Sequence, residues 1–232
     1  MTNFAKEFLD WSEAWAPLIP LTIFMMRRPK IPYLKTIFIY LCIALLLNVL
    51  IDGIWKGKHY FPVEFKNDVP AFLQDNNFLY NLQSICRLFL LILFFDGLDF
   101  KALKIKNHYV LLIAAILIIL NFTLWQHFTQ FSNTLFSFES IVLLIYSLSY
   151  FLYLINRDEV NAAFDPSLLV VTGIAVYEAV NFFIFLFHEA LMQQNPVFSA
   201  AIWKVHDYVF IVLCLFFAKA FYGERKPMLK LF

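Results

Sequence analysis

Long uninterrupted runs of apolar residues are the feature that most restricts how this chain can fold. Seven segments each contain about 20 mostly apolar residues, the length that an α-helix needs to cross the hydrocarbon core of a bilayer. The runs are continuous rather than alternating, which disfavours transmembrane strands. The sequence therefore predicts an all-α membrane protein, a seven-transmembrane helix bundle with spans at approximately residues 8–26, 33–55, 78–95, 109–127, 133–155, 167–191 and 198–221.

The composition supports lipid as the solvent. Hydrophobic residues make up 62% of the chain and charged residues 15%, whereas a soluble domain is nearer half apolar and a quarter charged. No connection between the apolar segments is long enough for a second folded domain, so we expect residues 1–232 to form one transmembrane domain. The net charge of +1 gives no reason to expect a nucleic-acid partner.

The first segment, about residues 8–26, is the weakest candidate for a membrane helix. It carries Asp10, Glu13, Pro17 and Pro20, and proline interrupts helical hydrogen bonding. It also lacks the basic start and small-residue cleavage site of a signal peptide. We expect this segment to be retained as the first span.

Basic residues predict the orientation, because loops rich in lysine and arginine face the cytoplasm. The connections on the opposite side hold only Lys6, Lys56, Lys58 and Lys66. This asymmetry predicts an outer N-terminus and a cytoplasmic C-terminus. The side predicted to be cytoplasmic holds Arg27, Arg28, Lys30, Lys35, Lys101, Lys104, Lys106, Arg157, Lys219, Arg225, Lys226 and Lys230.

Polar side chains in every predicted span lie at middle to outer depth, while the inner halves carry no charge. Ionisable groups inside a membrane cost free energy, so they usually face the bundle interior and serve function. This pattern predicts an outward-facing polar pocket above an apolar floor. The candidate ligand-binding residues are Asn48, Asp52, Gln83, Arg87, Asn121, Trp125, Glu139, Glu178, Asn181, His206 and Asp207.

The acids within the spans outnumber the bases. Arg87 and Lys204 are the firm positive charges, with His206 optional, and they face five carboxyl groups: Glu13, Asp52, Glu139, Glu178 and Asp207. Five ionised acids cannot share two cations at low dielectric without a large cost. Some acids are protonated, or the pocket is well hydrated, or a cationic ligand completes it.

Structural roles compete with these functional readings. A pair between Arg87 and either Glu139 or Asp52 would simply lock helices together. Lys204 and Asp207 are three residues apart near a helix end, a spacing that favours an interfacial ion pair.

Several motifs are absent from the sequence. There is no HExxH or other paired-histidine motif, and no second histidine is spaced to join His206, so no metal site is predicted. No glycine-rich phosphate loop occurs, and we predict no cofactor. The cysteines Cys42, Cys86 and Cys214 show no CxxC spacing, which favours buried thiols. No lysine lies near the centre of the last span, which disfavours a retinal photoreceptor.

Five stretches of the chain resemble a group of uncharacterised heptahelical proteins of Bacteroidetes-type bacteria. They are NVLIDG, NNFLYNLQSICRLFL, FESIVLLIYSLSYFLYLI, LLVVTGIAVYEAVNFFIFLF and a last span with a polar outer end. The resemblance covers most of the chain and implies a seven-helix fold, but it implies no activity. It fits a location in the bacterial inner membrane.

A second, weaker resemblance is to the small membrane-bound terpene cyclases of meroterpenoid pathways. Those enzymes place an acid four residues after an Asn in the second span and another acid in the last span. Asn48, Asp52 and Asp207 look like that arrangement. Asp52 stands where the family usually has Glu.

The leading functional hypothesis is a receptor-like protein that binds a small amphipathic or lipid-derived ligand and is read by a membrane or cytoplasmic signalling partner. The runner-up is an intramembrane enzyme in which Asp52 or Asp207 is the catalytic acid and Trp125 stabilises a carbocation. A third is a proton-coupled transporter or channel that uses Arg87, Glu139 and Glu178 as a relay. A structural subunit of a larger complex is a further alternative.

Overall fold

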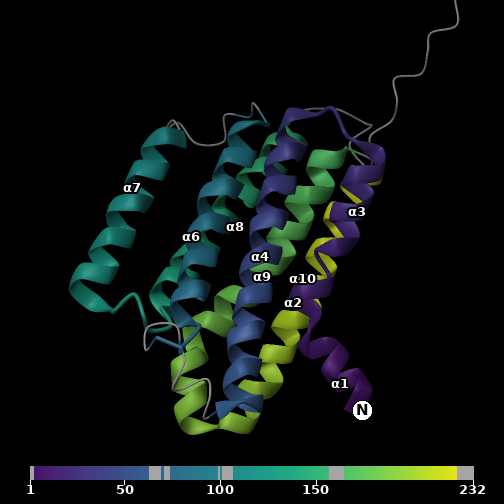
Figure 1. Cartoon of the computed structure of the whole chain (residues 1–232). Helices are drawn as coiled ribbons and strands as arrows, with labels where there is room; N and C mark the ends of the chain where they lie inside the picture. The colour runs from purple at the N-terminus through teal and green to yellow at the C-terminus, as the bar shows by residue number, and fades with distance from the viewer. Residues whose placement is uncertain are drawn as a thin grey trace, which may run out of the picture.

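The structure is a computed structural model that describes residues 3–62, 69–70, 74–98, 100, 107–156 and 165–223. The described residues form helices and no strand (Figure 1). Six of the seven predicted segments coincide with helices long and apolar enough to cross a membrane, so the prediction of an all-helical bundle of membrane dimensions is confirmed. They are α4 (Pro32–Tyr60), α6 (Asn77–Asp96), α7 (Asn107–Leu120) with the π-helix η2 (Asn121–Trp125), α8 (Asn133–Ile155), α9 (Pro166–Gln194) and α10 (Pro196–Tyr222).

The first predicted span is divided into three short helices. These are α1 (Asn3–Asp10), α2 (Ser12–Trp15) and α3 (Leu18–Arg27). Pro17 directly precedes α3, and it has no backbone N–H to continue the hydrogen bonding of α2. Because of these interruptions, this segment is not among the six helices that reach spanning length. Its prolines and acids are the sequence features that set it apart.

Six helices form a closed ring in which each packs against the next, in the order α3, α10, α9, α8, α6 and α4. The helix α2 packs against α4 and α10. The helix α7 lies outside the ring, beside α6 (Figure 1). Only 17% of its apolar stretch is buried, against 56% for α6. Side chains that point into the bundle therefore come from the six helices of the ring and from α2, and not from α7.

The helices α9 and α10 approach each other very closely. A Cβ atom added to Gly173 would lie 2.8 Å from the Cβ atom of Phe216, so only glycine allows this packing. A single residue, Asn195, joins the two helices, and its side chain accepts a hydrogen bond from the backbone N–H of Phe198 at 3.1 Å. These two helices form a tight antiparallel hairpin.

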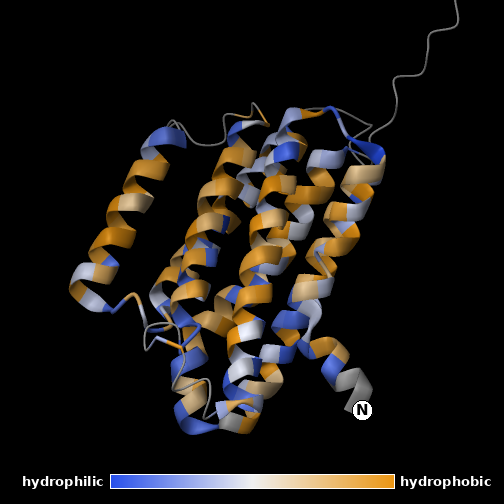
Figure 2. Cartoon of the chain, viewed as in Figure 1, coloured by the Kyte–Doolittle hydropathy of each residue, from blue (hydrophilic) through white to orange (hydrophobic). Residues whose placement is uncertain are grey.

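The outer surface along the helices is apolar. Leu46, Ile119 and Phe183 are each 61% exposed, and hydrophobic residues follow the middle of the helices while hydrophilic ones gather near the ends (Figure 2). Such a surface is costly in water and suited to lipid. The side-chain distribution supports an integral membrane protein.

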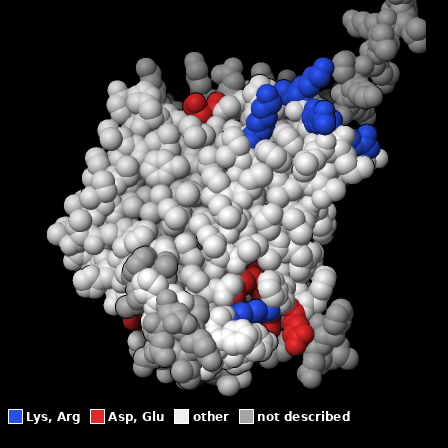
Figure 3. All heavy atoms as spheres, in the orientation of Figure 1, with Lys and Arg blue, Asp and Glu red and all other residues white. Residues whose placement is uncertain are grey.

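Charged groups lie at the two ends of the bundle. On the face in Figure 3, most of the basic side chains gather at one end, which also carries an acidic group, and the opposite end carries acidic side chains with a basic one among them. Arg27 and Arg28 lie at the end of α3 and Lys35 lies in the first turn of α4, so these residues mark the basic end. Of the residues used to predict orientation, Lys66, Lys101, Lys104, Lys106, Arg157, Arg225, Lys226 and Lys230 lie outside the described residues, as does the side chain of Lys6.

Candidate functional site

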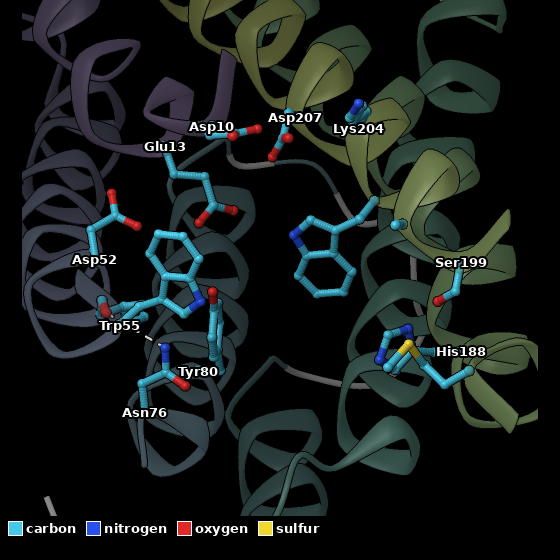
Figure 4. A pocket seen from close by; sticks show the side chains of 14 residues that line it. Asp10, Glu13, Asp52, Trp55, Asn76, Tyr80, His188, Ser199, Lys204 and Asp207 are labelled. Atoms are coloured by element: carbon cyan, nitrogen blue, oxygen red, sulfur yellow. Dashed lines mark hydrogen bonds between the residues drawn. The ribbon is translucent and has the colours of Figure 1, made fainter. Parts of the chain in front are cut away.

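A cavity of about 560 Å³ opens at the end of the bundle opposite Arg27 and Arg28. Its volume falls within the range usual for small-molecule sites. Its wall combines residues from the N-terminal helices α1, α2, α4 and α6 with residues from α9 and α10 (Figure 4). These helices are far apart in the sequence, and the packing of the bundle brings them together. We call this space the acidic cavity. It is lined by Asp10, Glu13, Ile51, Asp52, Trp55, Asn76, Tyr80, His188, Met192, Ser199, Ala200, Trp203, Lys204 and Asp207.

Four carboxyl groups line the acidic cavity, and they come from four different helices. Asp10 is on α1, Glu13 on α2, Asp52 on α4 and Asp207 on α10. The carboxyl groups of Asp10, Glu13 and Asp207 point toward the same region of the cavity (Figure 4). Lys204 also belongs to the lining. The cavity wall therefore carries more acidic than basic groups.

Two of these acids, the buried Asp207 and the half-buried Asp52, form no hydrogen bond or ion pair among the described residues. Asp207 is 7% exposed, accepts no hydrogen bond and makes no ion pair within 4 Å, not even with Lys204 one turn away. The Oδ2 atom of Asp52 is buried and accepts no hydrogen bond. Buried polar groups normally have a partner, so these oxygens are available to a ligand.

Aromatic rings form another part of the lining. Trp55 lies one turn after Asp52 on α4, and Trp203 lies one turn before Asp207 on α10. The ring of Tyr80, on α6, meets that of Trp203 edge to face at a centroid distance of 6.4 Å. Each unpartnered acid therefore has an indole as its neighbour on the same face of its helix.

Glu13 connects the acidic cavity to the interior through His206. Its Oε1 atom lies 2.9 Å from Nε2 of His206, and Nδ1 of His206 lies 2.7 Å from Oδ1 of Asn181. A neutral imidazole has one N–H and can donate to only one of these two oxygens. In this arrangement the second contact forms when the ring carries a second proton or when Glu13 donates its own. The backbone oxygen of Glu13 also accepts a hydrogen bond from Asn48 at 2.9 Å.

A second polar cluster, the buried network, lies deeper in the ring. It consists of Ser84, Arg87, Glu139, Ser140, Tyr177 and Glu178. Arg87 forms a two-point ion pair with Glu139, with Nη2 at 2.8 Å from Oε2, and donates from Nη1 to the hydroxyl of Tyr177 at 2.7 Å. Ser84 donates to the same Glu139 carboxylate. Glu139 is fully buried, so this ion pair connects α6 to α8 out of contact with solvent.

Glu178 is the less satisfied acid of the buried network. Its Oε2 atom accepts a hydrogen bond from Ser140 at 2.7 Å, while its Oε1 atom has no hydrogen-bond partner and lies 3.8 Å from Nε of Arg87. One guanidinium thus faces two carboxyl groups. The space that separates Arg87 and Gln83 from the acidic cavity holds only about 10 Å³, room for about one water molecule.

The residues predicted to bind a ligand therefore divide into five groups. Asp52 and Asp207 line the acidic cavity, while Gln83, Arg87 and His206 line the narrow space beneath it. Asn48 and Asn181 hold Glu13 and His206, and Glu139 and Glu178 belong to the buried network. Asn121 and Trp125 lie on η2, away from the cavity lining.

The region around η2 has a structural role that explains the position of Asn121. Asn121 donates to the hydroxyl of Ser132 at 3.0 Å, and Trp125 is 67% exposed. Asn81, which was not among the predicted site residues, donates to the backbone oxygens of Phe128 and Gln130 at 2.8 and 2.7 Å. Asn81, Ser84 and Arg87 recur every third residue in an apolar helix, and this spacing marks one polar face.

The predicted site lacks most of the lining of the acidic cavity, including the acids Asp10 and Glu13 and several aromatic residues. Trp55, Tyr80 and Trp203 line the acidic cavity, but in sequence they resemble the aromatic residues that are common at membrane interfaces. The positions of Trp55 and Trp203, one turn from Asp52 and Asp207, were the available signal.

The donor geometry of the site is unlike that of a metal centre. Within the described parts of the chain, no three His, Cys, Asp or Glu side chains are grouped so as to hold a metal ion.

Comparisons of this chain with protein-family models, with curated proteins and with solved structures find no match.

Proposed function

We propose that this chain is a receptor-like integral membrane protein that binds a small amphipathic or lipid-derived ligand in the acidic cavity. The observation that carries the proposal is the cavity of about 560 Å³ at one end of the ring. The space between this cavity and the buried network is far smaller, at about 10 Å³. The wall offers both aromatic rings and unpartnered carboxyl groups. A ligand with an apolar body and a polar group fits this lining.

The proposed orientation places the acidic cavity on the outer side. In this arrangement α1, α2 and α3 together make the first of seven crossings, beside α10 and α4. The N-terminus is outside and the C-terminus is cytoplasmic, in a bacterial inner membrane. The position of Arg27, Arg28 and Lys35 at the opposite end supports this, because basic residues favour the cytoplasmic side.

Cysteine labelling tests the orientation. In a background without Cys42, Cys86 and Cys214, single cysteines at Gln194 and Arg27 place one thiol at each end of the bundle. We expect a membrane-impermeant maleimide to label Gln194→Cys in intact spheroplasts and to label Arg27→Cys only after lysis. The reverse pattern would show that the cavity faces the cytoplasm.

The contact between Glu13 and His206 provides a route for signalling. Glu13 lines the acidic cavity, and through His206 it contacts Asn181 on α9. A ligand that competes for Glu13 weakens this contact and changes how α2 packs against α10. A membrane or cytoplasmic partner would read that change as a shift between two states.

Two neighbouring alanines on α10 provide a matched test of ligand binding. Both alanines are exposed, but Ala200 lines the cavity and Ala201 lies outside its lining. We expect native mass spectrometry of protein purified from bacterial membranes to detect bound small molecules on the wild type and on Ala201→Phe. Ala200→Phe fills the cavity and should lose them. Equal occupancy in the two variants would refute binding in this cavity.

An intramembrane acid–base enzyme is the second candidate. The observation that favours it is that Asp52 and Asp207 line one cavity together with Trp55, Tyr80 and Trp203. A carboxylic acid could protonate an alkene or epoxide of an isoprenoid, and indole faces could stabilise the resulting carbocation. Product analysis after incubation with geranylgeraniol and its epoxide tests this candidate. Unchanged product in Asp52→Asn and Asp207→Asn would exclude these acids.

A further inference from the structure

We infer that the acidic cavity binds an organic cation, a protonated amine or quaternary ammonium group carried on an apolar body. This inference rests on the proposed function and specifies its ligand class. It begins with the two unpartnered acids. Asp207 is more than nine-tenths buried, and its carboxyl group points into the cavity (Figure 4). Asp52 has a buried oxygen without a hydrogen-bond partner.

Ionised carboxyl groups are acceptors only, so they need a donor or a positive charge. Removing such a group from water without a partner costs free energy, which a bound cation offsets. A carboxylate or phosphate ligand would instead meet four acidic side chains on the wall, from Asp10, Glu13, Asp52 and Asp207. The charge of the lining therefore favours a cation over an anion.

The protein's own basic groups near the cavity are engaged elsewhere or lie outside ion-pair distance. The ammonium of Lys56 lies over the ring of Trp11, 3.3 Å from its centroid. His206 contacts Glu13, and Arg87 contacts Glu139. Lys204 lines the cavity but makes no ion pair within 4 Å of Asp207 among the described residues. No basic side chain in this part of the chain therefore takes the place of the ligand at Asp207.

The size and the rings of the cavity specify an organic cation. The described acids are not grouped so as to hold a metal ion, and a space of about 560 Å³ admits a molecule of many atoms. Trp55, Tyr80 and Trp203 add aromatic surface to the same wall. Aromatic rings attract ammonium groups and also pack against apolar bodies.

A series of probes of matched shape and different charge tests the inference on the full chain in detergent. The probes are 2-phenylethylamine, its trimethylammonium analogue, 2-phenylethanol and 3-phenylpropionate. We expect the two cations to raise the melting temperature and to bind at least about tenfold more tightly than the alcohol, with the carboxylate weakest. The affinity of the cations should also fall with added salt.

Variants connect that preference to the cavity. Asp207→Asn should weaken the cations about tenfold or more and leave the alcohol unchanged, whereas Ala200→Phe should weaken all probes. Ala201→Phe is the control and should bind like the wild type. Size-exclusion profiles and melting temperatures without probe verify that each variant is folded.

The outcomes separate this inference from the proposed function. If the cations bind no better than the alcohol, or if none of the probes binds, the cation inference is wrong. The proposed function still stands in either case if Ala200→Phe loses the molecules that copurify with the wild type. If Ala200→Phe and Ala201→Phe bind cations equally, the acidic cavity is not the cation site.

Discussion

The acidic cavity and the buried network both place carboxyl groups inside the same ring of helices, but Asp207 of the cavity and Glu139 of the network are partnered differently. In the buried network, Glu139 receives two bonds from Arg87 and one from Ser84. In the acidic cavity, Asp207 has no hydrogen-bond or ion-pair partner among the described residues, and Asp52 has a buried oxygen without one. The first arrangement fixes helices in place, and the second is open to a ligand.

This difference shows that a buried acid is not by itself evidence of function. A matched ion pair becomes costly when one member is removed, because the other is left as an unpaired buried charge. An unmatched acid should behave in the opposite way, since its removal relieves a cost. Stability measurements on the two regions can therefore test whether the contrast is real.

Arg87→Met should give the largest effect. It leaves Glu139 and Tyr177 without their shared partner, and the free energy of unfolding should fall by about 3–5 kcal/mol. Unfolding in mixed detergent and denaturant measures this change. The double variant Arg87→Met with Glu139→Leu should recover most of the loss. If the double variant is less stable than Arg87→Met, the ion pair is not the origin of the effect.

His206→Leu should have the second largest effect, because His206 lies between the two regions. Both Glu13 and Asn181 lose their contact with the imidazole of His206. We expect the free energy of unfolding to fall by about 1–3 kcal/mol. The same unfolding measurement applies, with Tyr208→Leu as the control because Tyr208 is 51% exposed. Equal stability of the two variants would show that the contact between Glu13 and His206 does not hold α2.

Tyr177→Phe should have a smaller effect on the same network. It removes one hydrogen bond to Arg87 but keeps the ring and the ion pair with Glu139. We expect a loss of about 1 kcal/mol, compared with Tyr109→Phe on the exposed face of α7. A loss as large as that of Arg87→Met would mean that the hydroxyl, rather than the ion pair, holds the network together.

Asp207→Asn should have the smallest effect on stability and the clearest effect on binding. Because Asp207 has no ion-pair partner within 4 Å, we expect the free energy of unfolding to stay within about 1 kcal/mol of the wild type or to rise. Glu139→Gln provides the comparison, and it should be destabilised. A loss in Asp207→Asn equal to that in Glu139→Gln would remove the distinction between the two regions.

The long helices could be predicted from the sequence because hydrophobic length alone identifies them. The segment predicted at residues 33–55 is α4 (Pro32–Tyr60), and that at 78–95 is α6 (Asn77–Asp96). The first segment is different, because only its interruption at Pro17 is marked by a proline in the sequence, whereas that at Trp11 depends on local backbone geometry. Hydropathy averaged over a span does not detect such breaks.

The candidate site was less accessible to prediction, because it depends on how each helix is rotated and on which helices are neighbours. The sequence places Arg87 and Asp207 at a similar depth. It does not show that Arg87 meets Glu139 on α8 while Asp207 meets the cavity. Trp125 shows the same limitation, since the structure places it on a peripheral π-helix with its ring largely exposed.

The close packing at Gly173 has a mechanical consequence for ligand entry. Helices whose backbones nearly touch, and which are connected by one residue, can hardly slide past each other. The α9–α10 side of the cavity is therefore stiff, whereas Asp10 and Glu13 are on short helices with a break on either side of α2. If the cavity widens to admit a ligand, the movement therefore occurs in the interrupted N-terminal helices, while the α9–α10 pair stays in place.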